Sequence, residues 1–345
     1  MSAPIGVALV GAGFIADYHL AALRPLPGVV LRAVVSRDAA RAAAAAARHG
    51  VAQASTDLAE VLARDDVQAV VVATPDDTHE AVAGACLRAG KAVLLQKPMA
   101  TDSAACRRLI AVAAGTGADL QVSWMHRHFE EVAAAREWIA SGTIGRVTSI
   151  RLRNATPGPD WGAWFFARER VGGGVVLQLG AHGIDLAEHL FGPIASVSAR
   201  TATLVPQRHL ADGQVVDVEN PDSAWATYTL AGGIVVSHEM SMVEQAGCDR
   251  FRMEIYGTGG TLWLRTERGR LAVFAPARLG ARGWFAPALP EAPLGQRQHA
   301  QWIAGLRGEV PREDTAGAGL RGLLVAEAIA GSAAAGGAEL AVKEG

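Results

Sequence analysis

Lys97 is the residue whose type and position most directly suggest chemistry in this sequence. Lysine is rare here, because Lys91, Lys97 and Lys343 are the only lysines among 32 basic residues and the rest are arginines. Unlike arginine, a lysine ammonium can lose its proton where its surroundings disfavour charge, so it can serve as an acid or a base. Pro98 follows and fixes the chain just after the amine. We therefore interpret Lys97 as a chemical group and not as an ordinary surface charge.

A glycine-rich turn near the N-terminus predicts a bound dinucleotide. The stretch Gly11-Ala12-Gly13-Phe14-Ile15-Ala16 lies between an apolar run and a helical pattern, which is the setting that the G-x-G-x-x-G/A motif requires. The two glycines let backbone amides approach a pyrophosphate, and the helix N-terminus favours its negative charge. The expected contacts are Gly11, Gly13, Phe14 and Ile15. The alternative interpretation is an ordinary glycine turn.

The residues after the second apolar run bear on which dinucleotide is bound. An NAD site usually has an acid there, about 20 residues beyond the motif, that accepts hydrogen bonds from the ribose. This chain instead has Ser36 and Arg37, with Arg41 one helical turn further on. These groups suit a 2'-phosphate, so the sequence predicts NADP(H) over NAD(H). Two alternatives stay open, since a strand one residue longer would bring in Asp38 and Arg37 could be a solvated surface charge.

The elements that must position these residues alternate in type along the first third of the chain. Apolar runs at 7–10, 29–35, 69–73, 92–95 and 119–122 predict buried strands, and the patterns at 15–23, 39–48, 58–64, 80–89 and 103–114 predict helices. This alternation predicts a doubly wound parallel sheet, an α/β Rossmann domain over residues 1–122. Ligands of such sheets bind at the carboxyl ends of the strands, which is where Lys97 falls.

The pattern changes in the remainder, which we predict to be an α+β domain over residues 123–345 for substrate binding and oligomerisation. Alternating or apolar runs at 146–154, 195–205, 223–230, 234–242, 251–257 and 261–264 predict a largely antiparallel open sheet. A helix is expected at 130–140, and helices near 181–190, 299–306 and 316–334 are expected to cover one face of that sheet. The other face is then available to a subunit partner, so we predict a homodimer or homotetramer.

Composition excludes several classes of protein. A net charge of −2 over 345 residues gives no positive field for nucleic acid. No apolar stretch approaches the roughly 20 residues of a membrane helix, and the first residues lack the features of a secretion signal, so a cytoplasmic protein is expected. Cys86, Cys106 and Cys248 are far apart, which favours buried residues over a disulfide framework or a thiolate metal site.

Three motifs together resemble the glucose-fructose oxidoreductase / inositol dehydrogenase / MocA family of NAD(P)-dependent oxidoreductases. They are Gln96-Lys97-Pro98, the stretch Ala73-Thr74-Pro75 with His79, and the block 172–185, which reads GGGVVLQLGAHGID. The resemblance covers most of the chain and implies catalytic roles for Lys97 and His182, with Asp185 and Gln178 binding or orienting the substrate. It also implies that the cofactor site includes Thr74, Pro75, His79, Gln96 and Lys97.

Two positions depart from the family pattern. Gln96 replaces a glutamate before the lysine, and Gln178 replaces an acid four residues before the histidine. Glutamine keeps hydrogen-bonding capacity and loses charge, so the pKa of Lys97 should be lower than that of a lysine flanked by carboxylates, which favours its service as a base. The opposite consequence is equally open: the changes weakened catalysis or shifted the substrate class.

Other residues are candidates for specificity. Arg127, Arg153, Arg168 and Arg170 lie in segments expected to border the cleft and would suit an anionic sugar derivative, although most are expected to be surface residues. Trp164 offers a face for stacking on a sugar or on nicotinamide. His126 and His128 could equally be packing residues. With His182 they do not have the spacing of a ligand set, so we predict no metal.

These features together predict an NAD(P)-dependent dehydrogenase or reductase acting on CH–OH groups of a sugar, polyol or related small molecule. Lys97 and His182, from the two predicted domains, are expected to act on the same substrate carbon beside the nicotinamide. Two alternatives remain. One is glycoside cleavage assisted by redox chemistry with a tightly held cofactor, and the other is an NADP-binding sensor or scaffold that lost catalysis.

Overall fold

The structure is a computed structural model of the chain and describes residues 3–246, 249–265, 270–280 and 282–343. The chain forms two compact units. Unit 1 comprises Met1–His128 and Ala292–Leu320, and unit 2 comprises Phe129–Glu291 and Arg321–Gly345. The sequence predicts a single crossing near residue 122, whereas here the chain passes into unit 2, returns to unit 1 at residue 292 and leaves it again at residue 321.

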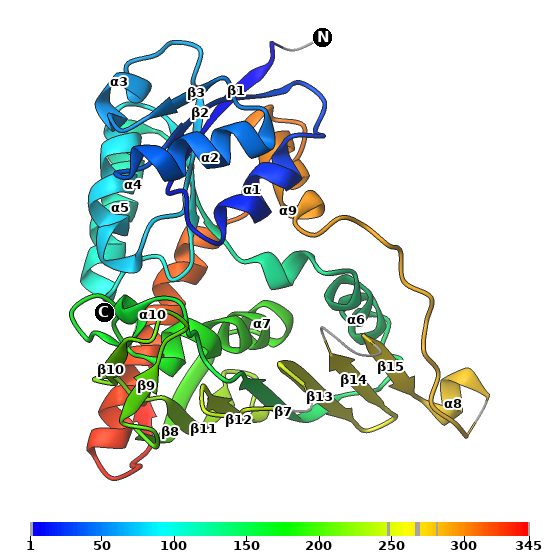
Figure 1. Cartoon of the computed structure of the whole chain (residues 1–345). Coiled ribbons are helices and arrows are strands. Elements are labelled where there is room, and N and C mark those ends of the chain that lie inside the picture. The colour runs from blue at the N-terminus through cyan, green and yellow to red at the C-terminus, as the bar shows by residue number, and fades with distance from the viewer. Residues whose placement is uncertain (1–2, 247–248, 266–269, 281, 344–345) are drawn as a thin grey trace. The chain divides into compact units, whose positions relative to one another are not determined.

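Unit 1 is built on a parallel sheet, as predicted. Its described residues form six strands in the order β3-β2-β1-β4-β5-β6, and every pairing is parallel (Figure 1). The strands are β1 (Ile5–Val10), β2 (Val29–Val35), β3 (Gln53–Ser55), β4 (Ala69–Val72), β5 (Ala92–Gln96) and β6 (Leu120–Ser123). Only β3 escaped sequence analysis, because it is three residues long and lacks an apolar run.

Helices cover both faces of this sheet, which is the doubly wound arrangement. The central strands are buried on both faces, and this explains their continuous apolar sequences. The helices of unit 1 are α1 (Ala16–Leu23), α2 (Ala39–His49), α3 (Leu58–Leu62), α4 (His79–Arg88), α5 (Ser103–Thr116) and α9 (Gln296–Leu306), with short turns η1 (Asp76–Thr78) and η2 (Met125–His128).

Helix α9 is the reason that the chain returns to unit 1. Trp302 and Ile303 are 1% and 2% exposed, and they pack in the same hydrophobic core as Leu20 and Leu23 of α1. The expectation that this helix covers the second sheet is therefore wrong. The apolar face of α9 is buried in the core of unit 1. The order of elements along the sequence does not show which of the two units buries this face.

Unit 2 contains a mixed sheet in which all but one pairing is antiparallel. Within the described ranges it has eight strands in the order β15-β14-β13-β7-β12-β11-β8-β16, and β7 with β12 is the parallel pair. The strands are β7 (Val147–Ala155), β8 (Ile194–Ala202), β11 (Ser223–Leu230), β12 (Val235–Ser241), β13 (Phe251–Gly257), β14 (Thr261–Arg265), β15 (Leu271–Phe274) and β16 (Leu340–Ala341). A separate hairpin is made by β9 (Gln207–His209) and β10 (Val215–Asp217).

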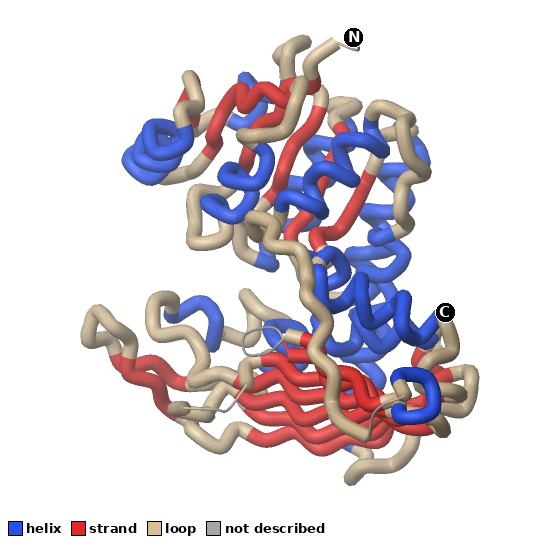
Figure 2. The backbone as a smooth tube through the Cα atoms, turned by 90° about the vertical axis from the view of Figure 1, so that its right-hand side faces the viewer, coloured by secondary structure: helices blue, strands red, loops and turns tan. Residues whose placement is uncertain are grey.

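The helices of unit 2 lie on one face of its large sheet, as Figures 1 and 2 show. They are α6 (Glu130–Ala140), α7 (Ala181–Phe191) and the second half of α10 (Thr315–Ala334), while the four-residue helix α8 (Pro276–Leu279) lies near one edge. Ser332 of α10 accepts the backbone N–H of Ala199 in β8. In the part of the chain that is described, the opposite face carries no helix.

The cysteines and the apolar helices bear on the protein classes considered from composition. Cys86 and Cys106 are buried and form no disulfide within the described residues, and Cys248 lies outside them. None of the described helices has both the length and the apolar character needed to cross a membrane.

Candidate active site

The glycine turn after β1 has the geometry of a dinucleotide cradle. Gly11 has φ of +104°, and a Cβ at this position would stand 2.3 Å from the carbonyl oxygen of Ala73, so only glycine fits there. At Gly13 a Cβ would meet nothing within 4 Å, so the space above this residue is open. Ala16 is 2% exposed and packs in the core, which brings α1 close to the sheet.

The N-terminus of α1 differs from those of three neighbouring helices. In α2, α3 and α5 an aspartate accepts hydrogen bonds from first-turn N–H groups, and these caps are Asp38, Asp57 and Asp102. The cap position of α1, Ile15, makes no such bond. Phe14 beside it is 80% exposed. The donor set of an uncapped helix end next to an open glycine fits a pyrophosphate.

The residues expected to read the ribose follow β2. Asp38 caps α2, because its Oδ1 accepts the N–H groups of Ala40 at 2.9 Å and Arg41 at 3.1 Å. Its Oδ2 pairs with Arg41 Nε at 3.4 Å. Ser36 accepts the N–H of Asp38 at 3.3 Å, and the side chain of Arg37 is exposed. β2 ends at Val35, three residues before Asp38.

Lys97 follows β5 at the carboxyl edge of the parallel sheet. Gln96 is 9% exposed, and its Oε1 accepts the backbone N–H of Lys97 at 3.3 Å. The Lys97–Pro98 peptide bond is cis. The neighbouring strand β4 ends at the same edge and leads into Thr74 and Pro75. The fully buried His79 lies just beyond them. Lys97 is therefore carried by the same sheet edge as the glycine cradle, because β1 pairs with β4 and β4 with β5.

The second group of predicted site residues lies in unit 2, on one continuous helical segment. Val176–Gly180 forms a π-helical turn that leads directly into α7. Gln178 lies in this turn, and His182 and Asp185 follow at spacings of four and three residues, which places all three on one side of the segment. Asp185 is 3% exposed. The sequence predicts the helix from residue 181, whereas helical structure begins five residues earlier, and π-turns of this kind are common at functional sites.

Three glycines allow this helical segment to pack closely against neighbouring residues of unit 2. Gly174 has φ of +51°, and a Cβ there would stand 2.4 Å from the Pro221 carbonyl oxygen. A Cβ at Gly180 would stand 2.3 Å from Met240 Sδ on β12. A Cβ at Gly183 would lie 2.7 Å from Asn154 Oδ1 of β7. The segment therefore lies against the Pro221 backbone at Gly174 and close to the side chains of β12 and β7 at Gly180 and Gly183.

A buried polar chain supports α7 from the sheet, and sequence analysis missed it. His238 Nε2 lies 2.8 Å from Asn154 Oδ1, and Tyr228 Oη lies 3.0 Å from His238 Nδ1. An acceptor amide oxygen fixes the ring hydrogen on Nε2, so the Tyr228 hydroxyl donates to Nδ1. Burial lowers the pKa of His238 to about 3, so the ring is neutral. The sequence carries one signal for this polar chain, because Asn154, Tyr228 and His238 are polar residues at inward positions of three predicted strands.

The remaining candidates for specificity divide between the two units. Arg127 lies in η2 of unit 1. Trp164 lies in the 3-10 turn Ala163–Phe166 of unit 2, and its ring stacks on Phe165 with centroids 3.8 Å apart. Arg153 lies on the outward face of the large sheet, because its neighbour Asn154 points inward to α7. Arg153 does not border the segment that carries His182.

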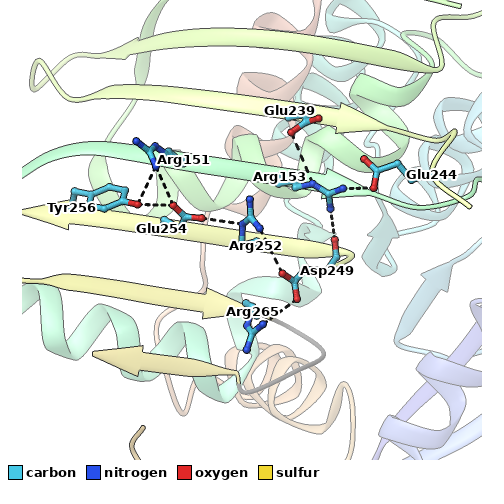
Figure 3. Close-up of polar contacts among 9 residues, drawn as sticks. All are labelled: Arg151, Arg153, Glu239, Glu244, Asp249, Arg252, Glu254, Tyr256 and Arg265. Atoms are coloured by element: carbon cyan, nitrogen blue, oxygen red, sulfur yellow. Dashed lines mark hydrogen bonds and ion pairs between the residues drawn. The ribbon is translucent and has the colours of Figure 1, made fainter. Parts of the chain in front are cut away.

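Figure 3 shows where Arg153 belongs: an ion-pair network on that outward face. Its guanidinium contacts Glu239 at 3.9 Å and also pairs with Glu244. Arg168 likewise has a partner in its own unit, since it donates to the Glu219 carbonyl at 2.6 Å. Two of the four arginines considered for an anionic substrate therefore have other roles. Among the described residues, no three His, Cys, Asp or Glu side chains are grouped so as to hold a metal ion.

The fold and the cradle define an oxidoreductase with an NAD-binding Rossmann unit, and comparison with known proteins agrees. The family model described as "Oxidoreductase family, NAD-binding Rossmann fold" matches residues 5–124, and the one described as "GFO/IDH/MocA C-terminal domain" matches residues 132–263. The chain belongs to the Gfo/Idh/MocA family of oxidoreductases.

Individual relatives span most of the chain. Inositol 2-dehydrogenase of Rubrobacter xylanophilus is 30% identical over 345 residues, covering 94% of this chain and 89% of the relative. Levoglucosan dehydrogenase of Pseudarthrobacter phenanthrenivorans is 28% identical over 294 residues, covering 76% and 74%. The solved structure of GenD2 from gentamicin A biosynthesis in complex with NAD has a TM-score of 0.82 at 29% identity, covering 99% of this chain and 97% of that one.

Proposed function

We propose that this protein transfers a hydride between a nicotinamide cofactor and a hydroxyl- or carbonyl-bearing carbon of a sugar, polyol or related small molecule. The observation that carries the proposal is the sheet edge of unit 1, where the open glycine cradle of β1 and the amine of Lys97 after β5 share one parallel sheet. The printed names of two relatives, inositol and levoglucosan dehydrogenases, support the substrate class.

The proposed roles follow from what the reaction needs. The nicotinamide, when bound, supplies the hydride acceptor or donor. The hydroxyl of the substrate must lose its proton during oxidation, and we assign that proton transfer to Lys97 and His182. In reduction the same groups return the proton. Asp185 and Gln178 bind or orient the substrate, and Arg127 and Trp164 contribute to its selection.

Turnover of a Lys97→Ala variant tests the proposal, after a screen of sugars, polyols and sugar acids with both cofactors has found a substrate by nicotinamide absorbance. We expect a loss of about 100-fold or more in kcat with cofactor affinity largely retained, and a similar loss for His182→Ala. Lys91→Ala is the matched control, because Lys91 precedes β5 at the opposite end of the strand and donates to the Arg64 carbonyl. Near-normal turnover in Lys97→Ala overturns the assignment.

The preferred cofactor is part of the proposal. We infer that NADP(H) binds more tightly than NAD(H), because Asp38 is engaged as a helix cap while the hydroxyl of Ser36 and the guanidinium of Arg37 lie at the strand end. A carboxylate that already accepts two N–H groups and an arginine has less to offer a ribose hydroxyl. A guanidinium offers paired donors to a phosphate.

We also propose that the outward face of the large sheet in unit 2 binds a second copy of the chain. This face holds a groove of about 540 Å³ whose charged lining residues are Arg151, Arg153, Arg200, Arg252 and Glu239, and Trp225 on it is 45% exposed. The groove itself is mainly basic, and the carboxylates Glu239, Glu244 and Glu254 lie on the same face of the sheet (Figure 3). Two copies related by a two-fold axis can therefore set carboxylates of one copy against arginines of the other.

The mass of the protein in solution, measured by light scattering after size exclusion, tests the self-association. Trp225→Glu should lower the mass toward that of one chain. Trp161→Glu is the control, since Trp161 is similarly exposed at 53% but lies outside the groove. A wild-type protein with the mass of one chain contradicts the proposal.

A further inference from the structure

His79 is a buried histidine whose role the proposed proton transfers do not explain. It opens α4, immediately after the loop that follows β4, and it is 0% exposed. Sequence analysis places it with the cofactor contacts. Its ring is nevertheless enclosed by the protein, and both of its nitrogens have partners in the backbone.

The two ring nitrogens of His79 connect two different loops. Nδ1 lies 2.8 Å from the carbonyl oxygen of Pro98, and Nε2 lies 2.9 Å from the carbonyl oxygen of Thr74. Thr74 follows β4 and Pro98 follows β5, and these strands are neighbours in the parallel sheet. Carbonyl oxygens only accept, and a neutral imidazole carries one ring hydrogen, so it donates to one of these carbonyls at a time; both contacts are hydrogen bonds only when both ring nitrogens carry a hydrogen. The imidazole is therefore a clamp across the edge where the two strands end.

The clamp acts on the backbone beside Lys97. Pro98 is bonded directly to Lys97, and its ring restricts the rotation of the chain at that point. Holding the Pro98 carbonyl therefore limits where the Lys97 Cα and the stem of its side chain lie. In the loop after β4, Thr78 Oγ1 donates to the Pro75 carbonyl at 2.7 Å and lies 2.7 Å from Thr74 Oγ1, which ties this loop to the start of α4.

We propose that His79 is a positioning residue that fixes Lys97 through the Pro98 carbonyl, and that it does not touch the cofactor. The proposal deepens the proposed function and rests on it for the role of Lys97. A shift of about 1 Å in a reacting group can cost about 100-fold in rate, so a buried hydrogen bond one residue from the amine is sufficient to matter.

Two conservative variants separate the two hydrogen bonds. The side-chain nitrogen of asparagine takes the place of Nδ1, and that of glutamine takes the place of Nε2. His79→Asn therefore keeps a donor for the Pro98 carbonyl, and His79→Gln keeps one for the Thr74 carbonyl. We expect kcat within about threefold of wild type in His79→Asn and about 10- to 100-fold lower in His79→Gln, with cofactor affinity and KM unchanged in both.

A second measurement does not depend on turnover. The chain has three lysines, so the rate at which each amine reacts with acetic anhydride can be followed by mass spectrometry of its peptide. In the protein without cofactor, His79→Gln should change the rate at Lys97 at least about threefold relative to Lys343, and His79→Asn should leave it unchanged. Lys91 reports on the general integrity of the unit, and the unfolding temperature of each variant is measured alongside.

Each outcome decides between the alternatives. Equal effects of the two variants on kcat and on Lys97 labelling overturn the positioning role, as does weaker cofactor binding at normal kcat, which would make His79 a cofactor contact. If the wild-type protein turns over no substrate in the screen, the proposed function fails, and the labelling of Lys97 still confirms or refutes the clamp.

Discussion

His19 Nδ1 lies 2.8 Å from His299 Nε2, and this contact joins two helices whose sequences are 280 residues apart. His19 belongs to α1, which opens at the dinucleotide cradle, and His299 belongs to α9. His299 Nδ1 donates to the Gly295 carbonyl at 2.7 Å, so its Nε2 accepts from His19. Both rings are fully buried, and the pair holds the returning segment against the helix that carries the cradle.

Acid should destabilise unit 1 through this pair. Burial lowers the pKa of His299 to about 4, and burial with the neighbouring His299 lowers that of His19 well below its usual 6.5. A histidine whose pKa is lower in the folded protein than in the unfolded chain binds its proton more tightly when the chain is unfolded. Its contribution to stability is therefore complete above about pH 6.5 and is lost as the pH falls toward 4.

Urea unfolding at several pH values between 7.5 and 4.5 measures this loss. The double variant His19→Phe with His299→Leu should be less stable at pH 7.5 and should have a shallower dependence on pH below 6.5. His209→Gln, at an exposed position of β9, serves as the control and should keep the wild-type slope. A double variant with the full wild-type slope contradicts the assignment.

Gly183→Ala should destabilise unit 2, because the added methyl group would stand 2.7 Å from Asn154 Oδ1 and from His238 Cε1. Overpacking of this kind costs about 1–3 kcal/mol in unfolding free energy. Gly115→Ala is the matched control, since Gly115 lies in α5 with nothing within 4 Å of its added methyl. That change should be neutral or stabilising by up to about 1 kcal/mol. Equal effects in chemical denaturation would show that α7 does not lie as close to the sheet as described.

The fold was largely predictable from sequence because its signals are local. Continuous apolar runs predict the central strands of the parallel sheet, and strands β2, β11 and β13 have the predicted bounds. The sequence does not show against which unit a later segment packs once the chain has left the first unit. The apolar face of α9 looks the same whether it covers one sheet or the other. Only the packing of Trp302 beside α1 decides this.

The candidate site also has one part that local sequence patterns predict and another that depends on contacts between distant segments. The glycine cradle is recognisable because its spacing is fixed by local backbone geometry, and Lys97 and the block containing His182 are recognisable through their resemblance to family motifs. The partners of His79 are not, since they are carbonyl oxygens, and every residue has one. The support of α7 by Asn154, His238 and Tyr228 is likewise a contact between distant strands, for which no local pattern exists.

Gly11→Ala and Gly13→Ala should have different consequences although the two residues belong to one motif. The methyl group at Gly11 would clash with the Ala73 carbonyl in a backbone conformation with positive φ, so this variant should lose stability as well as cofactor binding. The methyl group at Gly13 enters open space, so the unfolding temperature should be unchanged while cofactor affinity falls by about 10-fold or more. Calorimetry measures the unfolding temperature, and cofactor fluorescence measures the cofactor affinity. Unchanged affinity in Gly13→Ala would place the pyrophosphate elsewhere.

The proposed preference for NADP(H) predicts unequal effects of one substitution. Arg37→Ala should weaken binding of NADPH by about 10-fold, the lower end of what a hydrogen bond to a charged group contributes, and should leave NADH binding unchanged because NADH lacks the 2'-phosphate. Asp38→Asn is the control for the helix cap, since asparagine caps about as well as aspartate, and it should preserve the folded state while it removes a negative charge beside the site. If wild-type protein binds NADH more tightly than NADPH, the hydroxyl and guanidinium after β2 do not bind phosphate, and the Asp38 carboxylate serves the ribose in spite of its bonds to α2.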